Sequence, residues 1–244
     1  MSGPVLILGA ASGIARAVAR SFAEAGHPIQ LAARNSARLE EDAADLRTRY
    51  GVEVTLHDFD ALTLDSHAAF VEGLPVLPEV AVCAVGAMGE QAQSEADPQA
   101  AAHVMRSNFE GPASVLAHLA NAMEARGSGS IVGISSVAGD RGRASNYVYG
   151  SAKAGFTAFL SGLRNRLAKK GVHVVTVLPG FVRTAMLDGM DTPGPLTAEP
   201  AEVGAAVLKA VEKQKNVIYT RPIWGVVMAV IRNIPEPVFK KTSL

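Results

Sequence analysis

The stretch Val5-Leu6-Ile7-Leu8-Gly9-Ala10-Ala11-Ser12-Gly13-Ile14-Ala15 decides the fold of this chain. Four apolar residues typical of a buried strand lead directly into a glycine-rich turn, and the turn opens a segment with the apolar spacing of a helix. Glycines let the backbone pass close to a pyrophosphate, and a helix N-terminus contributes free N–H groups and the positive end of its dipole. A plain strand-to-helix turn is the alternative, but this context favours dinucleotide binding through Gly9, Ser12, Gly13 and Ile14.

Short apolar runs recur along the chain and alternate with Ala-rich, charged segments of helical length. The expected strands are residues 5–8, 29–33, 52–56, 80–85, 131–134, 172–178 and 217–219, and the expected helices are residues 14–25, 38–50, 112–125, 147–170 and 200–213. This alternation indicates parallel βαβ units, and fully apolar strands indicate a sheet covered on both faces. No linker, charge block or internal repeat divides the chain, so we expect one doubly wound, Rossmann-type α/β domain over residues 1–244.

Composition and charge exclude several classes of protein. Lys plus Arg and Asp plus Glu both number 23, so no overall basic field exists to attract nucleic acid. The N-terminus lacks the charged region and long apolar core of a signal peptide, and the apolar stretch 222–231 is about half the ~20 residues of a membrane span. Cys83 is the single cysteine and is expected to be a small buried apolar residue rather than a reactive thiol. The six histidines show no metal-ligand spacing, so the sequence predicts a cytoplasmic protein without a metal site.

The end of the second expected strand indicates which dinucleotide is preferred. NAD selection usually places a carboxylate there to accept from the ribose 2′-hydroxyl, but this sequence has Arg34. A guanidinium can hold the 2′-phosphate of NADP through a charge-assisted contact, whereas a solvated arginine is the simpler alternative. We therefore predict NADP(H) as cofactor. Asp60, with Asp58 as its rival, is the expected partner of the adenine amino group.

Three polar residues form the candidate catalytic group. Tyr149 and Lys153 are four residues apart in a helical segment, which places the phenol and the ammonium on one face. Ser136 follows the fifth expected strand, thirteen residues before Tyr149. Chance would produce this combination in roughly one chain of a hundred of this composition. Ser136 lacks the flanking glycines of a hydrolase nucleophile elbow, so a hydrolase is a minor alternative.

The ordered set of motifs resembles the short-chain dehydrogenase/reductase family over nearly the whole chain. The resemblance implies catalytic roles for Asn108, Ser136, Tyr149 and Lys153. It also implies cofactor contacts by Gly86, Tyr149 and Lys153 and by the late motif residues Pro179, Gly180, Val182 and Thr184. Two departures occur: Ala15 replaces the third glycine of the turn, and Cys83-Ala84-Val85-Gly86 stands where the family has Asn-Asn-Ala-Gly.

The implied reaction is NADPH-dependent reduction of a carbonyl compound to an alcohol. Tyr149 would donate the proton, and the nearby Lys153 ammonium would lower the pKa of its phenol. Ser136 would hold the carbonyl oxygen, Lys153 would also hold the nicotinamide ribose, and Asn108 would anchor a water that passes protons to Lys153. The alternative is a non-catalytic dinucleotide-binding module of the same fold, such as a redox-sensing partner.

Two further regions bear on the substrate. Arg141 and Arg143 follow Ser136 in the next loop and could grip a substrate phosphate, or they could be solvated loop charges or form a local pair with Asp140. The run 139–153 also resembles, with less specificity, the branch of the family that reduces lipid-phosphate-linked keto-sugars. The irregular stretch 188–197 is expected to be a mobile loop at the active site.

Residues 221–244 form an apolar and basic C-terminal extension that is unusual for the family. An apolar helix over 223–231 could cover a hydrophobic substrate, pack into a subunit interface or rest on a membrane surface, and the first two alternatives are favoured. The family resemblance further implies a homodimer or homotetramer acting on a small-molecule substrate.

Overall fold

A computed structural model describes residues 3–187, 189, 192–242 of the chain. Seven strands form one parallel sheet in the order β3-β2-β1-β4-β5-β6-β9. Their bounds are Val5–Leu8 (β1), Ile29–Ala33 (β2), Val54–Asp58 (β3), Val80–Cys83 (β4), Gly129–Ile134 (β5), Val172–Pro179 (β6) and Val217–Thr220 (β9). The strand order reverses between β1 and β4, so a crevice opens there beyond the carboxyl ends of the strands.

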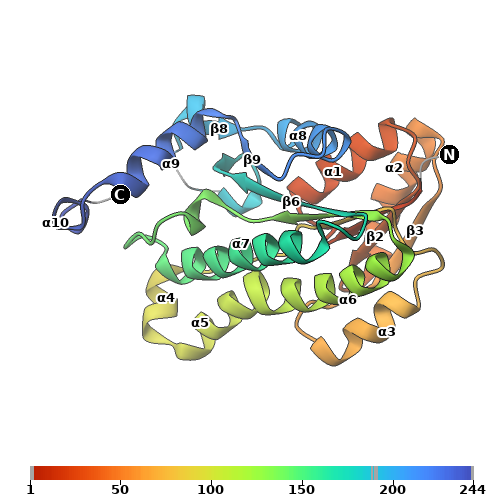
Figure 1. Cartoon of the computed structure of the whole chain (residues 1–244), viewed down its shortest axis with the longest axis horizontal. Helices are drawn as coiled ribbons and strands as arrows, with labels where there is room; N and C mark the ends of the chain where they lie inside the picture. Colours follow the sequence, from red (N-terminus) through yellow and green to blue (C-terminus); the bar gives the residue numbers. More distant parts are fainter. Residues whose placement is uncertain (1–2, 188, 190–191, 243–244) are drawn as a thin grey trace.

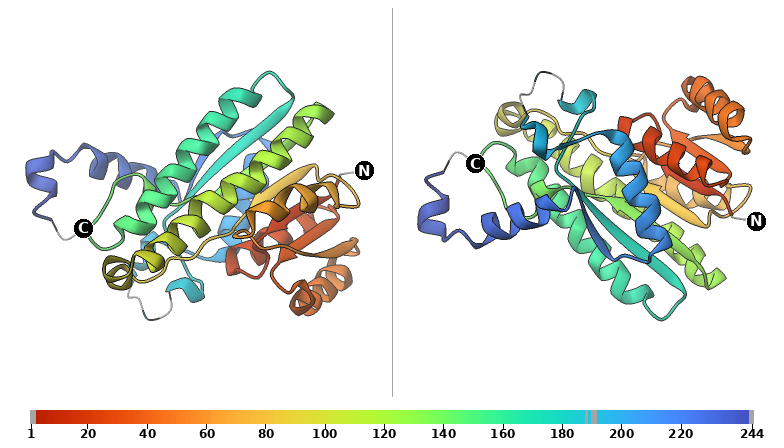
Figure 2. Two further views of the ribbon diagram at one scale, coloured as in Figure 1. Left: turned by 90° about the horizontal axis from the view of Figure 1, so that it is seen from below. Right: turned by 90° about the horizontal axis from the view of Figure 1, so that it is seen from above.

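Helices cover both faces of this sheet (Figure 1). One layer consists of α1 (Gly13–Glu24), α2 (Glu40–Tyr50) and α8 (Pro200–Glu212), and the opposite layer consists of α3 (His67–Glu72), α6 (Gly111–Arg126) and α7 (Tyr147–Leu167). The views from below and above show α6 and α7 side by side on one face and α1 beside α8 on the other (Figure 2). The expected doubly wound α/β fold is therefore what the structure shows.

The two layers enclose separate apolar cores because the strand side chains alternate between the faces. Val5 and Ile7 point into the core beneath α1 and α8, whereas Leu6 and Leu8 point into the core beneath α6 and α7. All four are completely buried. Strands that are apolar on both sides need cover on both sides, and that requirement fixes the three-layer architecture.

The remaining elements lie near the carboxyl edge of the sheet. They are α4 (Gln91–Ala96), α5 (Pro98–Met105), a π-helical turn at Arg106–Glu110, the short strand pair β7 (Phe181–Val182) and β8 (Thr197–Ala198), α9 (Ile223–Asn233) and α10 (Glu236–Phe239). Because α9 follows directly from the end of β9, it begins at this edge and extends away from the sheet with α10 (Figure 1). No helix in the described ranges is long and apolar enough to cross a bilayer.

Candidate functional site

A cavity of about 1170 Å³ lies beyond the carboxyl ends of the central strands. It extends from the turn before α1 to the segment after β6. The structure brings most of the residues expected from the sequence to its walls: Ser12, Gly13, Ile14, Gly86, Asn108, Ser136, Tyr149, Lys153, Pro179, Gly180, Val182 and Thr184. Gly9, Arg34 and Asp60 do not line it.

The turn between β1 and α1 is shaped for close approach by a ligand. Gly9 has a φ of 79°, a left-handed conformation that favours glycine, and a Cβ there would lie 3.0 Å from the Val85 backbone nitrogen. Ser12 caps α1, because its side chain accepts a hydrogen bond from the Ala15 N–H at 3.2 Å. A Cβ on Gly13 would lie 3.0 Å from Thr184 Cγ2, so any larger residue would narrow the cavity at this point. The backbone N–H groups at this helix start and the space above them fit a pyrophosphate.

Ser136, Tyr149 and Lys153 meet on the floor of the cavity. Lys153 is 4% exposed, and its Nζ donates to the Ile134 carbonyl at 3.1 Å and lies 5.7 Å from the centroid of the Tyr149 ring. Ser136 follows β5 with an extended backbone, and its Oγ accepts a hydrogen bond from the Ala138 N–H at 3.1 Å. The hydroxyl proton of Ser136 is therefore left to point toward another acceptor.

Burial shifts the pKa values of both Tyr149 and Lys153, and the shift of Tyr149 is opposite to the one expected. Burial raises the pKa of Tyr149 to about 12, and a hydrogen bond with Ser136 opposes that rise. Burial also lowers the pKa of Lys153 to about 8. The prediction that Lys153 lowers the pKa of Tyr149 finds no support in the protein alone, because burial outweighs the Ser136 hydrogen bond and Lys153 is not among the groups that shift this pKa.

Asn108 lies in the π-helical turn between α5 and α6. Its Nδ2 donates to the Ala87 carbonyl at 2.6 Å and to the Val104 carbonyl at 2.8 Å, whereas its buried Oδ1 has no partner among the described residues. A Cβ on Gly86 would lie 2.6 Å from that Oδ1 and 3.3 Å from Lys153 Nζ, so the two polar atoms flank one small space. An acceptor and a donor around such a space suit a bound water. Spacing alone gave no signal for the π turn, which recurs at functional sites in proteins.

The residues expected to contact the adenosine part of the cofactor do not line the cavity. Arg34 is exposed at the end of β2. Asp58 accepts a hydrogen bond from the Ser36 N–H at 2.7 Å, which lowers the pKa of its carboxyl and ties it to the turn after β2. Asp60 accepts from the Leu62 N–H at 3.0 Å through Oδ1. Both carboxylates therefore support local turns, and their roles toward adenine stay predictions.

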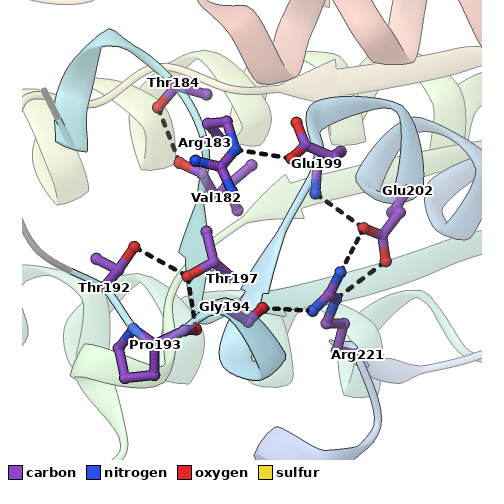
Figure 3. Close-up of polar contacts among 10 residues, drawn as sticks. All are labelled: Val182, Arg183, Thr184, Thr192, Pro193, Gly194, Thr197, Glu199, Glu202 and Arg221. Atoms are coloured by element: carbon purple, nitrogen blue, oxygen red, sulfur yellow. Dashed lines mark hydrogen bonds and ion pairs between the residues drawn. The ribbon is translucent and has the colours of Figure 1, made fainter.

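The segment after β6 is held by a set of ion pairs (Figure 3). Arg221 forms a two-pronged pair with Glu202, at 2.8 and 3.0 Å, and donates to the Gly194 carbonyl at 3.0 Å. Arg183 pairs with Glu199 at 2.7 Å. These contacts fix β7 and β8 beside the start of α8. The expected mobile loop begins in this segment, and its residues 188, 190 and 191 lie outside the described part of the chain.

The C-terminal helix supports the cavity from behind and does not line it. Trp224 is 4% exposed, its ring stands edge-on to Phe181, and its Nε1 donates to the Leu196 carbonyl at 2.9 Å. A Cβ on Gly180 would lie 2.0 Å from this indole, so only glycine fits there. Because no α9 residue is among the described residues that line the cavity, the alternative of a substrate-covering helix finds no support in this arrangement.

Several cavity residues gave no clear signal in the sequence. Gln91 at the start of α4 accepts a hydrogen bond from the Val148 N–H at 3.2 Å. Arg16 on α1 pairs with Asp42 at 3.0 Å, and Asn146 precedes α7 with a buried Oδ1 that has no partner among the described residues. Each lies at the cavity because elements that are distant in the sequence pack together there, and the periodicity of a single sequence does not predict such packing.

Other sequence predictions concern residues away from the reacting group. Cys83 is completely buried, as expected, and burial raises the pKa of its thiol to about 11, which disfavours the reactive thiolate. His67 is also buried, with its ring nitrogens bonded to Ser114 and to the Asp60 carbonyl, and burial lowers its pKa. Across the described ranges no three His, Cys, Asp or Glu side chains gather as a metal site would require.

Comparison with known proteins identifies the family. The family model described as short chain dehydrogenase matches residues 4–193. An uncharacterized oxidoreductase of Mycobacterium tuberculosis is 40% identical, with 98% of this chain and 96% of that protein covered. A short-chain dehydrogenase from Sphingobium yanoikuyae in complex with NADPH superposes with a TM-score of 0.81 at 25% identity, covering 96% of this chain and 97% of the other.

The shared fold extends to enzymes with a different cofactor. A 3-oxoacyl-[acyl-carrier protein] reductase from Brucella melitensis in complex with NAD superposes with a TM-score of 0.81 at 24% identity, covering 93% of this chain and 98% of the other. The family match over most of the chain agrees with the arrangement of Ser136, Tyr149 and Lys153. This chain belongs to the short-chain dehydrogenase family of oxidoreductases.

Proposed function

We propose that this protein reduces a carbonyl compound to an alcohol with NADPH as the reductant. The observation that carries the proposal is the meeting of Tyr149, Ser136 and Lys153 in one cavity that continues to the N-terminus of α1. The turn at Ser12 and Gly13 would hold the pyrophosphate, and Thr184 would close over it from the segment after β6. When bound, the reduced nicotinamide supplies a hydride to the carbonyl carbon.

The chain's own residues manage the proton. Negative charge develops on the carbonyl oxygen, so a donor must be within hydrogen-bond reach. The Tyr149 phenol, with a pKa of about 12, holds its proton at every working pH and gives it to that oxygen. The Ser136 hydroxyl donates to the same oxygen and positions it against Tyr149. The phenolate that remains is stabilised by the Lys153 ammonium.

Proton return follows from the surroundings of Lys153. A pKa of about 8 allows this group to give up and regain a proton near neutral pH. The unpartnered Oδ1 of Asn108 would hold a water beside Lys153 Nζ, so that solvent protons reach Tyr149 through Lys153. Asn108 is therefore a positioning residue for this path.

Arg34 supports a preference for NADPH over NADH. It stands exposed at the end of β2, where a 2′-phosphate would be accessible to a guanidinium. The related structures contain NADPH in one case and NAD in another, so the preference rests on this residue. We further propose a homodimer or homotetramer, with α6 and α7 providing an extended outer face (Figure 2).

The proposal is tested by Tyr149→Phe, with Tyr147→Phe as the matched control. Tyr147 lies two residues earlier and is 45% exposed, so its hydroxyl should not affect turnover. Ketone-dependent oxidation of NADPH should fall about 10²- to 10⁴-fold in Tyr149→Phe, while NADPH affinity measured by calorimetry stays the same. Equal turnover in both variants would refute Tyr149 as donor. Tight NADPH binding without turnover of any ketone by the unaltered protein would favour the non-catalytic module.

A further inference from the structure

The loop between β5 and α7 contains three charged residues, and two of them are fully occupied. Arg141 Nη1 donates to the carbonyls of Ile231 and Ile234, both at 2.6 Å, and its guanidinium lies 3.6 Å from the centroid of the Phe239 ring. Asp140 accepts a hydrogen bond from the Tyr219 hydroxyl at 2.8 Å. The possibility that Arg141 grips a substrate is therefore wrong, because this side chain binds the end of α9.

Arg143 is in a different situation. It lines the cavity together with Ser136 and Tyr149, and its Nε is buried without a hydrogen-bond partner among the described residues. None of the ion pairs found among the described residues includes Arg143. Burial lowers the pKa of Arg143, with Asp140 opposing that shift, yet a guanidinium stays charged under all working conditions. The residue as a whole is half-buried, but a buried N–H donor without a partner is costly, so this arrangement needs another explanation.

The loop holds Arg143 in place without using its side chain. The Arg143 carbonyl accepts from the Asn146 N–H at 3.0 Å, which forms a turn just before α7, and Arg141 fixes the loop from the other side. The same cavity is also lined by the apolar residues Val137, Val148 and Met186. The unpartnered Oδ1 of Asn146 lies in the same wall. Lys153 and Arg16 also line the cavity, but Lys153 donates to the Ile134 carbonyl and Arg16 pairs with Asp42. Among the described residues, Arg143 is therefore the lining cation whose side chain is available to recognise a negative group.

We propose that Arg143 binds an anionic oxygen group of the substrate, a carboxylate or a phosphate. The fork of N–H donors matches either group in two-pronged geometry. This inference rests on the proposed carbonyl reduction and defines its substrate class: a ketone whose carbonyl meets Ser136 and Tyr149 while its anionic group meets Arg143. The phosphate-binding turn before α1 belongs to a different element, so the two anion sites are served by separate parts of the chain.

The test compares ketones that differ only in charge. Levulinate is paired with its methyl ester to probe a carboxylate, and dihydroxyacetone phosphate is paired with dihydroxyacetone to probe a phosphate. The unaltered protein should prefer the anionic member of at least one pair in kcat/KM. Arg143→Gln should lower kcat/KM for that anionic ketone about ten- to a hundredfold and leave the neutral ketone within about twofold. Arg143→Lys should give a smaller loss, since charge remains without the fork.

Control measurements separate this inference from the proposed function. Arg20→Gln removes an arginine whose side chain is 56% exposed on α1, and it should not change kcat/KM for either the anionic or the neutral ketone. Binding of the anionic ketones is also measured by calorimetry in Tyr149→Phe protein, with and without Arg143→Gln, so that recognition is scored without turnover. A loss of affinity caused by Arg143→Gln there supports the inference even if no ketone is reduced. Equal effects on charged and neutral ketones, or no effect on either, would overturn it.

Discussion

Because the Lys153 ammonium is buried, we predict that replacing Lys153 with an apolar residue makes the protein more stable. Burial lowers the pKa of Lys153 from 10.5 to about 8. At about 1.4 kcal/mol per pKa unit, the folded state bears a cost of about 3 kcal/mol at pH 7. Lys153→Met removes that cost but also a hydrogen bond to the Ile134 carbonyl, worth about 1 kcal/mol. We expect a net gain of about 2 kcal/mol in the free energy of unfolding, together with loss of activity.

The gain in stability from Lys153→Met should become smaller as the pH rises. Between the folded pKa of about 8 and the unfolded value of 10.5, the unfolded chain retains a proton that the folded chain has released. The unaltered protein therefore gains stability as pH rises through this window. At pH 9.5 the remaining cost of the charge is only about 1.4 kcal/mol, so most of the advantage of Lys153→Met should disappear.

Urea denaturation followed by circular dichroism at pH 7 and pH 9.5 measures both quantities. Lys169→Met is the matched control, because Lys169 is exposed just after α7 and its removal should change stability little at either pH. The reasoning is refuted if Lys153→Met is no more stable than the unaltered protein at pH 7. It is equally refuted if a gain is present but does not shrink at the higher pH.

Three further substitutions test other parts of the site. Arg34→Ala should weaken NADPH binding about ten- to a hundredfold in calorimetric titrations, and an equal loss of NADH affinity would show that Arg34 does not read the phosphate. Gly86→Ala places a Cβ 2.6 Å from Asn108 Oδ1 and should lower turnover, whereas Gly162→Ala, which meets open space, should behave as the unaltered enzyme. Trp224→Ala should lower the free energy of unfolding in urea by about 3–5 kcal/mol, and a loss below 1 kcal/mol would contradict its buried packing on Gly180.

Much of the fold could be predicted because the central strands are apolar on both faces. The run Val5–Leu8 has no polar residue to place toward solvent, which specifies a covered parallel strand. The strands β7 and β8 were not predicted, since each contains only two residues and periodicity needs more. Helices α3, α4 and α5 were also missed, because six to eight residues do not define a helical period.

The candidate site was predictable where its chemistry depends on spacing along the chain. Tyr149 and Lys153 lie four residues apart in one helix, so their relative position follows from helix geometry alone. The hydrogen bonds of Arg141 could not be predicted, because they join its side chain to main-chain carbonyls about ninety residues later in the chain. The pKa values of Tyr149 and Lys153 were equally inaccessible, since they depend on how much water the folded chain excludes.

The bond from Arg141 to the end of α9 also sets an order of assembly during synthesis. The carbonyl of Ile231 is made ninety residues after Arg141, so the loop bearing Arg143 stays unanchored while most of the sheet is already available to fold. The loop bearing Arg143 can therefore take its final position only after α9 has been made. Arg141 also pairs with Glu236 and lies over the Phe239 ring, so the last residues of the described chain complete this anchor.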